Sequence, residues 1–269
     1  KNMIGIPLET ESYVDNVRVY RTKITYSQYV PSTGLPGTGA WLLPYRFYEN
    51  FSTGGSDVLR ETIDRYHAAG TNVQEANRED DQVNTLIYSH NNMLVAAKVQ
   101  NALISECAFT GFCTADASQG GWTIGNTGAL VPGSDGKTGI GYFVGSTTIT
   151  KSSIPAGKYI LSYWLKNDSG DIPLSGITIN TTTISSAEPN GWRFVQQTLT
   201  AAGTVSISLN PDVPTIHVDE LRFYPADAIM TTYSYSRTTL LASGMANENS
   251  IPGKFEYDEL LRLTGVKNY

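Results

Sequence analysis

Adjacent carboxylates are the side chains of this sequence whose spacing could support catalysis. Asp219 and Glu220 adjoin in IHVDELRFY, and Asp80 and Asp81 adjoin in a polar run that is typical of a solvated turn. A glycosidase needs two carboxylates on either side of one bond, and they can come from distant parts of a chain. The spacing of these acids therefore neither identifies nor excludes such a pair.

Other catalytic signatures do not occur in the sequence. The motifs G-x-S-x-G, H-E-x-x-H and C-x-x-C are missing. The segment GSDGKTG (Gly133–Gly139) ends like a phosphate-binding loop, but Val131 stands where that motif requires its first glycine. We interpret this segment as a hairpin loop, and we expect a protein without enzymatic activity.

Asp219 is the acid with the most unusual setting. Strand alternation predicts that it faces inward with Leu221 and Phe223. A buried carboxylate must be paired, hydrogen-bonded or bound to a metal. The simplest prediction is that Asp219 accepts hydrogen bonds from loop backbone N–H groups or from Ser and Thr hydroxyls.

Aromatic residues on a polar strand face indicate a different chemistry. On the strand Lys158–Asn167, alternation places Trp164 and Lys166 on the face opposite the core residues Tyr159, Leu161, Tyr163 and Leu165. Sugars stack their C–H faces on indole rings, and their hydroxyls bind neighbouring polar groups. Exposed aromatic residues commonly mark interfaces. We therefore predict carbohydrate binding by Trp164 and Lys166, with Tyr142 in a nearby binding loop. The alternative is that Trp164 packs beneath a loop or against the repeat segment.

The two cysteines, Cys107 and Cys113, lie in CAFTGFC. On one extended strand their Cα atoms would be about 20 Å apart, whereas a disulfide requires a separation below about 7 Å. A disulfide between them therefore needs a turn near Gly111. Two free, half-buried thiols are the alternative, and no second Cys or His pair completes a zinc site.

The composition indicates an all-β protein with few charges. The 269 residues include 25 Gly and 16 Tyr, charged residues make up 16%, and the net charge is −6. Nucleic acids and anionic membrane surfaces require a basic face, which this sequence lacks. No stretch approaches the roughly 20 apolar residues of a membrane span. The chain begins at Lys1, so we expect that a signal segment was removed or that the chain is part of a longer protein.

Short apolar runs separated by turn residues predict the strands. VRVYRTKITYSQY (Val17–Tyr29) fits a strand pair, and Asn84–Ala102 fits two strands around His90–Asn92. Residues 56–70 fit either a helix capped by Ser56 or a strand, and we favour the strand. Between 106 and 226, six short runs predict a jelly-roll β-sandwich, namely Gly139–Ile149, Lys158–Asn167, Ser175–Ile184, Trp192–Leu199, Thr204–Asn210 and Ile216–Pro225.

The segments on either side of this sandwich resemble a known repeat. TTYSY (Thr231–Tyr235) and FEYDELLRLTGV resemble the tyrosine–aspartate (YD, or RHS-type) repeats of large bacterial surface and secreted proteins, with Tyr257, Asp258, Arg262 and Leu263 at matching positions. Ser250 and Leu261 stand where such repeats carry glycine, which supplies positive φ or close packing. The order of segments resembles versions from Bacteroidetes-like bacteria that hold an inserted galactose-binding-like, carbohydrate-binding-module-type sandwich.

The resemblance implies a domain organisation and a cellular location. YD/RHS-like hairpin segments at 1–105 and 227–269 would flank a sandwich at 106–226, and the protein would be secreted or on the cell surface. Related sandwiches often hold a structural calcium ion through an acid at the position of Asp219 and another acid near the first strand. Cys113 stands at that second position, and thiols are poor calcium ligands. We therefore expect no metal and no cofactor.

Two functional hypotheses follow. We favour a non-enzymatic extracellular module that binds a glycan or cell-surface polysaccharide, or mediates adhesion. The alternative is a purely structural piece, such as a shell wall, fibre subunit or stalk, without a small ligand. Lone hairpins are marginally stable and exposed sheet edges recruit partners, so we expect self-association or pairing with other segments of the parent polypeptide.

Overall fold

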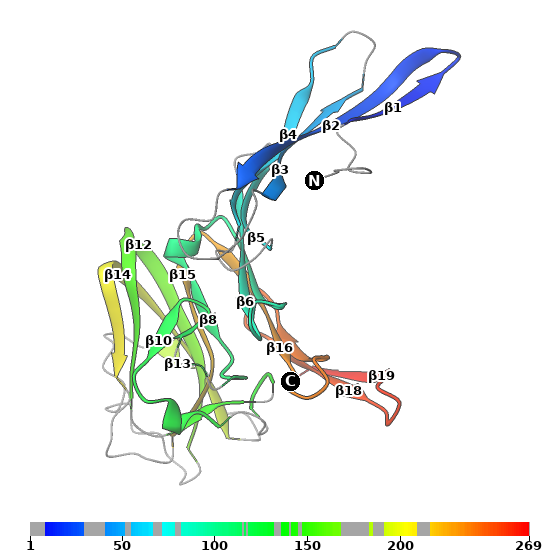
Figure 1. The fold of residues 1–269 in the computed structure, drawn as a ribbon. Helices are drawn as coiled ribbons and strands as arrows, with labels where there is room; N and C mark the ends of the chain where they lie inside the picture. The colour runs from blue at the N-terminus through cyan, green and yellow to red at the C-terminus, as the bar shows by residue number, and fades with distance from the viewer. Residues whose placement is uncertain are drawn as a thin grey trace. The chain divides into compact units, whose positions relative to one another are not determined.

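In a computed structural model, the chain forms two compact units, and the boundary between them lies between Asn84 and Thr85 (Figure 1). The structure describes residues 9–29, 41–51, 55–66, 72–78, 82–114, 116, 118–131, 136–139, 141–144, 147–167, 183–184, 191–208 and 216–268. These residues form antiparallel strands and two single turns of 3₁₀ helix, η1 (Ile104–Glu106) and η2 (Thr127–Ala129). The all-β prediction is confirmed. The division into segments at 1–105, 106–226 and 227–269 stays a prediction.

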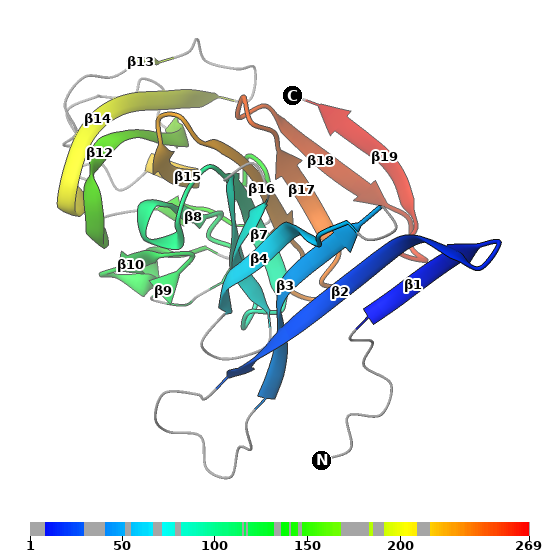
Figure 2. The same cartoon turned by 90° about the horizontal axis from the view of Figure 1, so that it is seen from above.

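The first unit is an antiparallel meander in which each strand pairs with the next (Figure 2). Its strands are β1 (Glu9–Val14), β2 (Val17–Tyr29), β3 (Trp41–Asn50), β4 (Val58–Tyr66) and β5 (Val73–Arg78). Asp15 and Asn16 link β1 to β2 with φ angles of 51° and 63°, as a two-residue hairpin turn requires. β4 confirms the strand predicted within residues 56–70.

The second unit contains a hairpin sheet in the order β6-β7-β16-β17-β18-β19. The strands are β6 (Val83–Ser89), which starts beside the unit boundary, β7 (Leu94–Gln100), β16 (Ile229–Tyr235), β17 (Ala242–Ala246), β18 (Pro252–Tyr257) and β19 (Leu263–Asn268). β7 and β16 are far apart in sequence but pair from Ile229–Gln100 to Thr232–Ala97. His90, Asn91 and Asn92 turn β6 into β7 with positive φ, which confirms the predicted pair of strands.

The turns between β17, β18 and β19 share one geometry. Asn247 Oδ1 accepts hydrogen bonds from the N–H groups of Asn249 and Ile251, and Ser250 has a φ of 61°. In the next turn Asp258 Oδ1 accepts from Leu260 and Arg262, and Leu261 also has a φ of 61°. Positive φ is therefore present at both positions where the repeat resemblance placed glycine, although neither residue is glycine.

The chain between β7 and β16 forms a second, sandwich-like sheet. Its strands are β8 (Ala108–Thr110), β9 (Ser118–Gln119), β10 (Trp122–Ile124), β11 (Phe143–Val144), β12 (Thr148–Asn167), β13 (Thr183–Ile184), β14 (Trp192–Ser208) and β15 (Ile216–Pro225). β12 pairs with β14 along most of its length, with β10 near its start and with β15 near its end. Most of the predicted strand Ser175–Ile184 lies outside the described residues.

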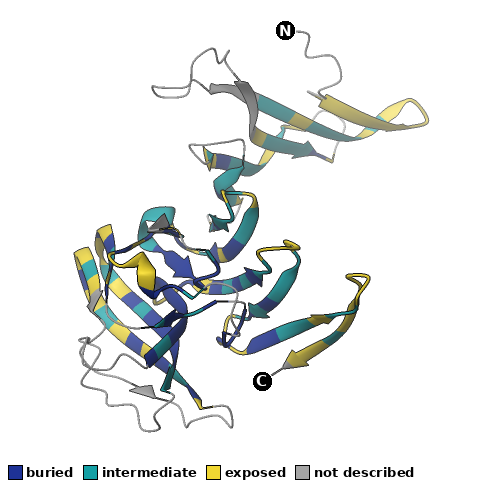
Figure 3. Cartoon of the chain, turned by 60° about the horizontal axis from the view of Figure 1, so that its bottom comes forward, coloured by how far each residue is buried: buried dark blue, intermediate teal, exposed yellow. Residues whose placement is uncertain are grey.

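Two apolar clusters lie on opposite sides of the β12–β15 pair. The core of the sandwich includes Trp122, Leu161 and Phe223, as the alternation of β12 predicted. The second cluster joins Ile160 and Tyr224 to residues of the hairpin sheet such as Val99 and Met230. Burial then falls from β16 to the almost fully exposed β19 (Figure 3). The hairpin sheet therefore packs on the sandwich through β7, β16 and β17, whereas the described residues of β19 are almost fully exposed.

Candidate functional site: a buried polar cluster

Strand β15 carries three charged residues within an apolar sequence, and all three are buried. Asp219, Glu220 and Arg222 are 0%, 1% and 0% exposed. Glu220 has a φ of 58°, and the pairing of β15 with β12 shifts register at this point. This irregularity is a β-bulge, in which β15 has one residue more than β12 between two paired positions. The alternation of side chains between the two faces of β15 is therefore interrupted at the bulge.

The bulge corrects one prediction. Asp219 pairs with Trp164 of β12, and neither belongs to the sandwich core that contains Leu221 and Phe223. Asp219 is buried as predicted, but the prediction that it faces inward with Leu221 and Phe223 is wrong. Regular alternation cannot be carried through a strand whose backbone bulges at Glu220.

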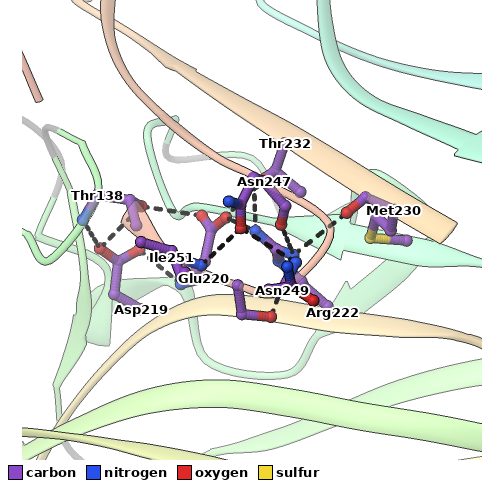
Figure 4. Close-up of polar contacts among 10 residues, drawn as sticks. Thr138, Asp219, Glu220, Arg222, Met230, Thr232, Asn247, Asn249 and Ile251 are labelled. Carbon is purple, nitrogen blue, oxygen red and sulfur yellow. Dashed lines mark hydrogen bonds and ion pairs between the residues drawn. The ribbon is translucent and has the colours of Figure 1, made fainter. Parts of the chain in front are cut away.

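Arg222 is the centre of a polar cluster that its hydrogen bonds and those of Thr138 define. The cluster consists of Thr138, Asp219, Glu220, Arg222, Thr232, Asn247 and Ser250, and Figure 4 shows most of these residues. One terminal nitrogen, Nη1, donates to the carbonyl oxygens of Met230 (3.3 Å) and Asn247 (3.0 Å) and to Ser250 Oγ (3.2 Å). The guanidinium of a sandwich strand thereby binds β16 and the turn that follows β17. The Asn247 carbonyl oxygen also accepts the N–H of Ser250 at 2.9 Å, so Arg222 binds a turn that its own backbone closes.

Glu220 supplies the charge that balances Arg222. Arg222 Nη2 donates to Glu220 Oε1 and to Thr232 Oγ1, each at 2.8 Å, and Thr232 Oγ1 also donates to Glu220 Oε1. A buried ion pair gains little over an apolar replacement of both partners, but removal of one partner leaves an uncompensated charge. Each partner of the pair therefore depends on the other to remain buried.

Thr138 joins the two carboxylates. Its backbone N–H donates to Asp219 Oδ2 at 3.1 Å, and its hydroxyl lies 2.9 Å from Glu220 Oε2 and 3.4 Å from Asp219 Oδ2. Because the hydroxyl has one proton, the nearer Glu220 oxygen is its acceptor. The predicted hydrogen bond from loop backbone to Asp219 is confirmed, whereas the Thr138 hydroxyl donates to Glu220.

Burial is the main cause of the raised pKa of Asp219. Loss of water, followed by the neighbouring Glu220 charge, raises the pKa of Asp219 to about 7, although backbone N–H groups of Thr138, Glu220 and Lys137 oppose the shift. The carboxyl therefore keeps its proton to a higher pH than an exposed aspartic acid does. Burial, followed by the Asp219 charge, also raises the pKa of the Cys113 thiol to about 12, so this thiol stays protonated.

The loop that holds Thr138 is wedged between the sandwich and the hairpin sheet. Residues 136–139 are all buried, so the part of the predicted hairpin loop that the structure describes is an interior turn. A Cβ atom on Gly244 of β17 would lie 1.7 Å from the carbonyl oxygen of Thr138, and one on Gly139 would lie 2.3 Å from Ser234 Cβ. Glycine at these positions lets the backbones touch.

The cluster is suited to positioning and not to chemistry on a substrate. Its carboxylates are closed off from solvent and already accept hydrogen bonds from protein groups. Among the described residues, no three His, Cys, Asp or Glu side chains are grouped as metal ligands. The described part of the chain also has no helix of sufficient length and apolarity to span a membrane.

Trp164 does not lie on an exposed face, which corrects the sequence prediction. It is 5% exposed, with Lys137 Nζ 4.4 Å above its ring centroid and the ring of Phe194 at 5.2 Å. The alternative interpretation, in which Trp164 packs beneath a loop, is correct. Alternation placed it on the right face of the strand, but the loop at 136–139 covers that face.

Tyr142 and Lys166, the other predicted binding residues, both neighbour His217. The rings of Tyr142 and His217 are stacked at 4.4 Å with an interplanar angle of 8°, and Lys166 pairs with His217 across β12 and β15. All three are partly exposed. The structure therefore brings Tyr142 and Lys166 together at His217, two residues along β12 from the covered Trp164.

The cysteines are free, as the alternative prediction held. Cys107 belongs to the apolar cluster beside the hairpin sheet. Cys113 is buried near Asp219 and Glu220, and burial, followed by the charge of Asp219, raises its pKa.

Sequence reasoning missed Arg222, Thr138 and Thr232. A signal for Arg222 was present, because an arginine and two acids within an apolar strand require buried partners. No comparable signal marks Thr138 or Thr232, which are ordinary loop and strand residues. Comparison with protein-family models and with curated protein sequences finds no match for this chain.

Proposed function

We propose that the protein is a non-enzymatic structural module of a larger bacterial surface or secreted protein, in which a sheet of repeated hairpins carries a β-sandwich in a fixed orientation. The finer fold assignments, a jelly-roll sandwich and YD/RHS-like repeats, belong to this proposal. The observation that carries it is the buried polar cluster. In this cluster the fully buried Arg222 of the sandwich binds residues of the hairpin sheet, and so joins the two parts of the second unit.

The repeated turns support the repeat assignment. Turns that begin at Ser236, Asn247 and Asp258 follow one another at equal intervals, and each uses the first side chain to accept backbone N–H bonds. Each also contains a residue of positive φ, at Leu240, Ser250 and Leu261 respectively. Such regularity is typical of stacked repeat units that bury their surfaces only against neighbours.

Hydrogen exchange of the intact chain tests the structural proposal. We expect β12, β15 and β16 to exchange at similar, slow rates because the sandwich and the hairpin sheet open together. In Arg222→Met, β16 and β17 should exchange faster than β12. The matched control is Arg262→Met, which removes the arginine of an exposed ion pair with Asp258 within one turn. This variant should leave all these exchange rates unchanged. Independent opening of β16 in the unmodified protein would contradict the proposal.

Carbohydrate binding is a second candidate, favoured by the stacked Tyr142 and His217 beside Lys166. A flat, partly exposed aromatic pair with a neighbouring ammonium group offers a stacking surface and a hydrogen-bond donor. A glycan-array screen tests it with Tyr142→Ala and Lys166→Ala. Tyr13→Ala, which removes an exposed tyrosine of β1, is the control. Binding that survives both site variants, or no binding at all, would exclude this role.

A further inference from the structure

Side chains hold one end of the pair β7–β16 together where the backbone does not. The backbone pairing of the two strands stops at Thr232–Ala97, three residues before β16 ends at Tyr235. Beyond that point the Tyr235 hydroxyl donates to the carbonyl oxygen of Val95 in β7 at 2.8 Å. The Tyr235 ring also meets the ring of His90 edge to face, at 6.0 Å with an interplanar angle of 79°. This end of the hairpin sheet therefore depends on contacts of two aromatic side chains.

His90 is held in place through one of its two ring nitrogens. It is the first residue of the turn between β6 and β7 and has a φ of 52°. Its Nδ1 lies 2.9 Å from Ser89 Oγ, whereas its Nε2 is buried and has no hydrogen-bond partner among the described residues. In the neutral ring Nε2 is a bare nitrogen when Nδ1 donates to Ser89. In the protonated ring Nε2 is a charged donor without an acceptor, and unsatisfied charged groups cost more than neutral ones.

Two charged side chains act on this ring from different segments. Burial, followed by the charge of Arg237 in the turn after β16, lowers the pKa of His90 from its ordinary value of 6.5, and Asp116 opposes the shift. Tyr235 stays neutral at these pH values because burial raises the pKa of its hydroxyl. A protonated His90 is therefore repelled by Arg237 and attracted by Asp116, whose side chain is exposed.

We propose that His90 is an acid-sensitive latch, which in its neutral form keeps the β6–β7 turn packed on the end of β16. When the ring takes up a proton, it leaves Tyr235 for solvent and for Asp116, and the unpaired ends of β7 and β16 open more often. The backbone pairing from Ile229–Gln100 to Thr232–Ala97 does not involve this ring. Opening is therefore local and reversible.

Acid opens the latch because folding lowers the affinity of His90 for a proton. The contact is fully kept above the ordinary pKa of 6.5, and it is lost as the pH falls towards the lower pKa of the closed ring. Since one proton is taken up, local opening rises at most about tenfold for each pH unit. The sign is opposite to that expected for Asp219, whose raised pKa stabilises the protein at low pH.

Hydrogen exchange of the intact chain between pH 5 and 8 tests the latch, with each rate divided by the intrinsic rate of an unfolded peptide. We expect exchange at the start of β7 and the end of β16 to rise below about pH 6.5. His90→Asn should remove this rise, because asparagine does not titrate and tolerates positive φ. His217→Asn replaces a histidine of the sandwich and is the matched control, which should keep the rise.

Titration of the histidine rings by nuclear magnetic resonance tests the charges around the latch. The His90 signal, identified by its loss in His90→Asn, should titrate below pH 6.5. Arg237→Met should raise the pKa of His90 and Asp116→Asn should lower it. Both shifts should shrink at high salt, because both charges are exposed and water and ions screen them.

Several outcomes would overturn the proposal. They are exchange that does not depend on pH, a rise that persists in His90→Asn or disappears in His217→Asn, and a His90 ring that titrates at or above its ordinary pKa. A titration that neither Arg237→Met nor Asp116→Asn shifts would also contradict it. The inference goes beyond the proposed structural role, and the exchange behaviour of Arg222→Met can succeed or fail independently of it.

Discussion

Two arginine–carboxylate ion pairs in the second unit have nearly equal lengths and opposite surroundings. Arg222 and Glu220 are 2.8 Å apart and at most 1% exposed. Arg262 and Asp258 are 2.7 Å apart, but their side chains are 73% and 26% exposed. The first pair binds groups from β16 and the turn after β17. The second lies within a single turn.

The difference shows that distance alone does not measure what an ion pair contributes. Water screens the exposed pair and solvates either partner when the other is removed. The buried pair has no such compensation, so each partner depends on the other and on the elements that deliver its hydrogen bonds. Local sequence creates the exposed pair Arg262–Asp258, whereas the packing of separate elements creates the surroundings of the buried pair Arg222–Glu220.

Removal of the buried arginine should give the largest effect. We expect Arg222→Met to lower the free energy of unfolding by about 3–5 kcal/mol, since it leaves the Glu220 charge buried and unpaired. Urea denaturation measures this, with Arg262→Met as the exposed counterpart that should show no measurable change. The double variant Arg222→Met/Glu220→Gln should recover part of the loss. Equal effects at the two arginines would refute the comparison.

The second prediction concerns two glycines in the same hairpin sheet. Gly244→Ala should destabilise the protein by at least about 2 kcal/mol, because its Cβ would lie 1.7 Å from the Thr138 carbonyl oxygen. Gly265→Ala in β19 should be neutral or slightly stabilising, because the nearest atom to its Cβ is the end of the Glu256 side chain at 3.4 Å. Thermal unfolding of both variants tests the contrast.

Asp219 makes the buried region sensitive to pH. Its folded-state pKa is raised from the ordinary value near 4 to about 7, so the folded protein holds this proton more tightly than the unfolded chain. The stabilisation is complete below about pH 4 and is lost as the pH rises to about 7, with a slope of at most about 1.4 kcal/mol per pH unit. In Asp219→Asn this contribution to the pH dependence should vanish. Urea denaturation at several pH values between 4 and 8 measures how the free energy of unfolding depends on pH. The same dependence in Asp219→Asn as in the unmodified protein would contradict the prediction.

The smallest predicted effect lies in the exposed turn. Leu261 holds a φ of 61°, a conformation that is unfavourable for a residue with a Cβ atom. Leu261→Gly should therefore raise the free energy of unfolding by up to about 1 kcal/mol, reduced by the greater freedom of glycine in the unfolded chain. Ser250→Gly relieves the same strain but removes an acceptor of Arg222, so it should not stabilise. Differential scanning calorimetry separates the two.

Much of the local structure followed from the sequence. Alternation identified β12 and the residues it sends into the core, and the polar run His90–Asn92 identified a hairpin turn, because strand period and positive φ are local properties. The face of Asp219 did not follow, because the bulge at Glu220 reverses the alternation within β15. The binding role predicted for Trp164 relied on an exposed face that Lys137 and its loop cover.

The sequence by itself determined an all-β chain, the hairpin turn at His90–Asn92 and the sparse charge of its strands. Those features depend on neighbouring residues, whose propensities and spacing act within a few positions of the chain. Only the tertiary structure decided that Arg222 reaches Asn247, that Thr138 bridges two carboxylates and that Gly244 must lack a side chain. These relations join residues that are distant in sequence, and they arise when a loop and two sheets exclude water from the same small volume.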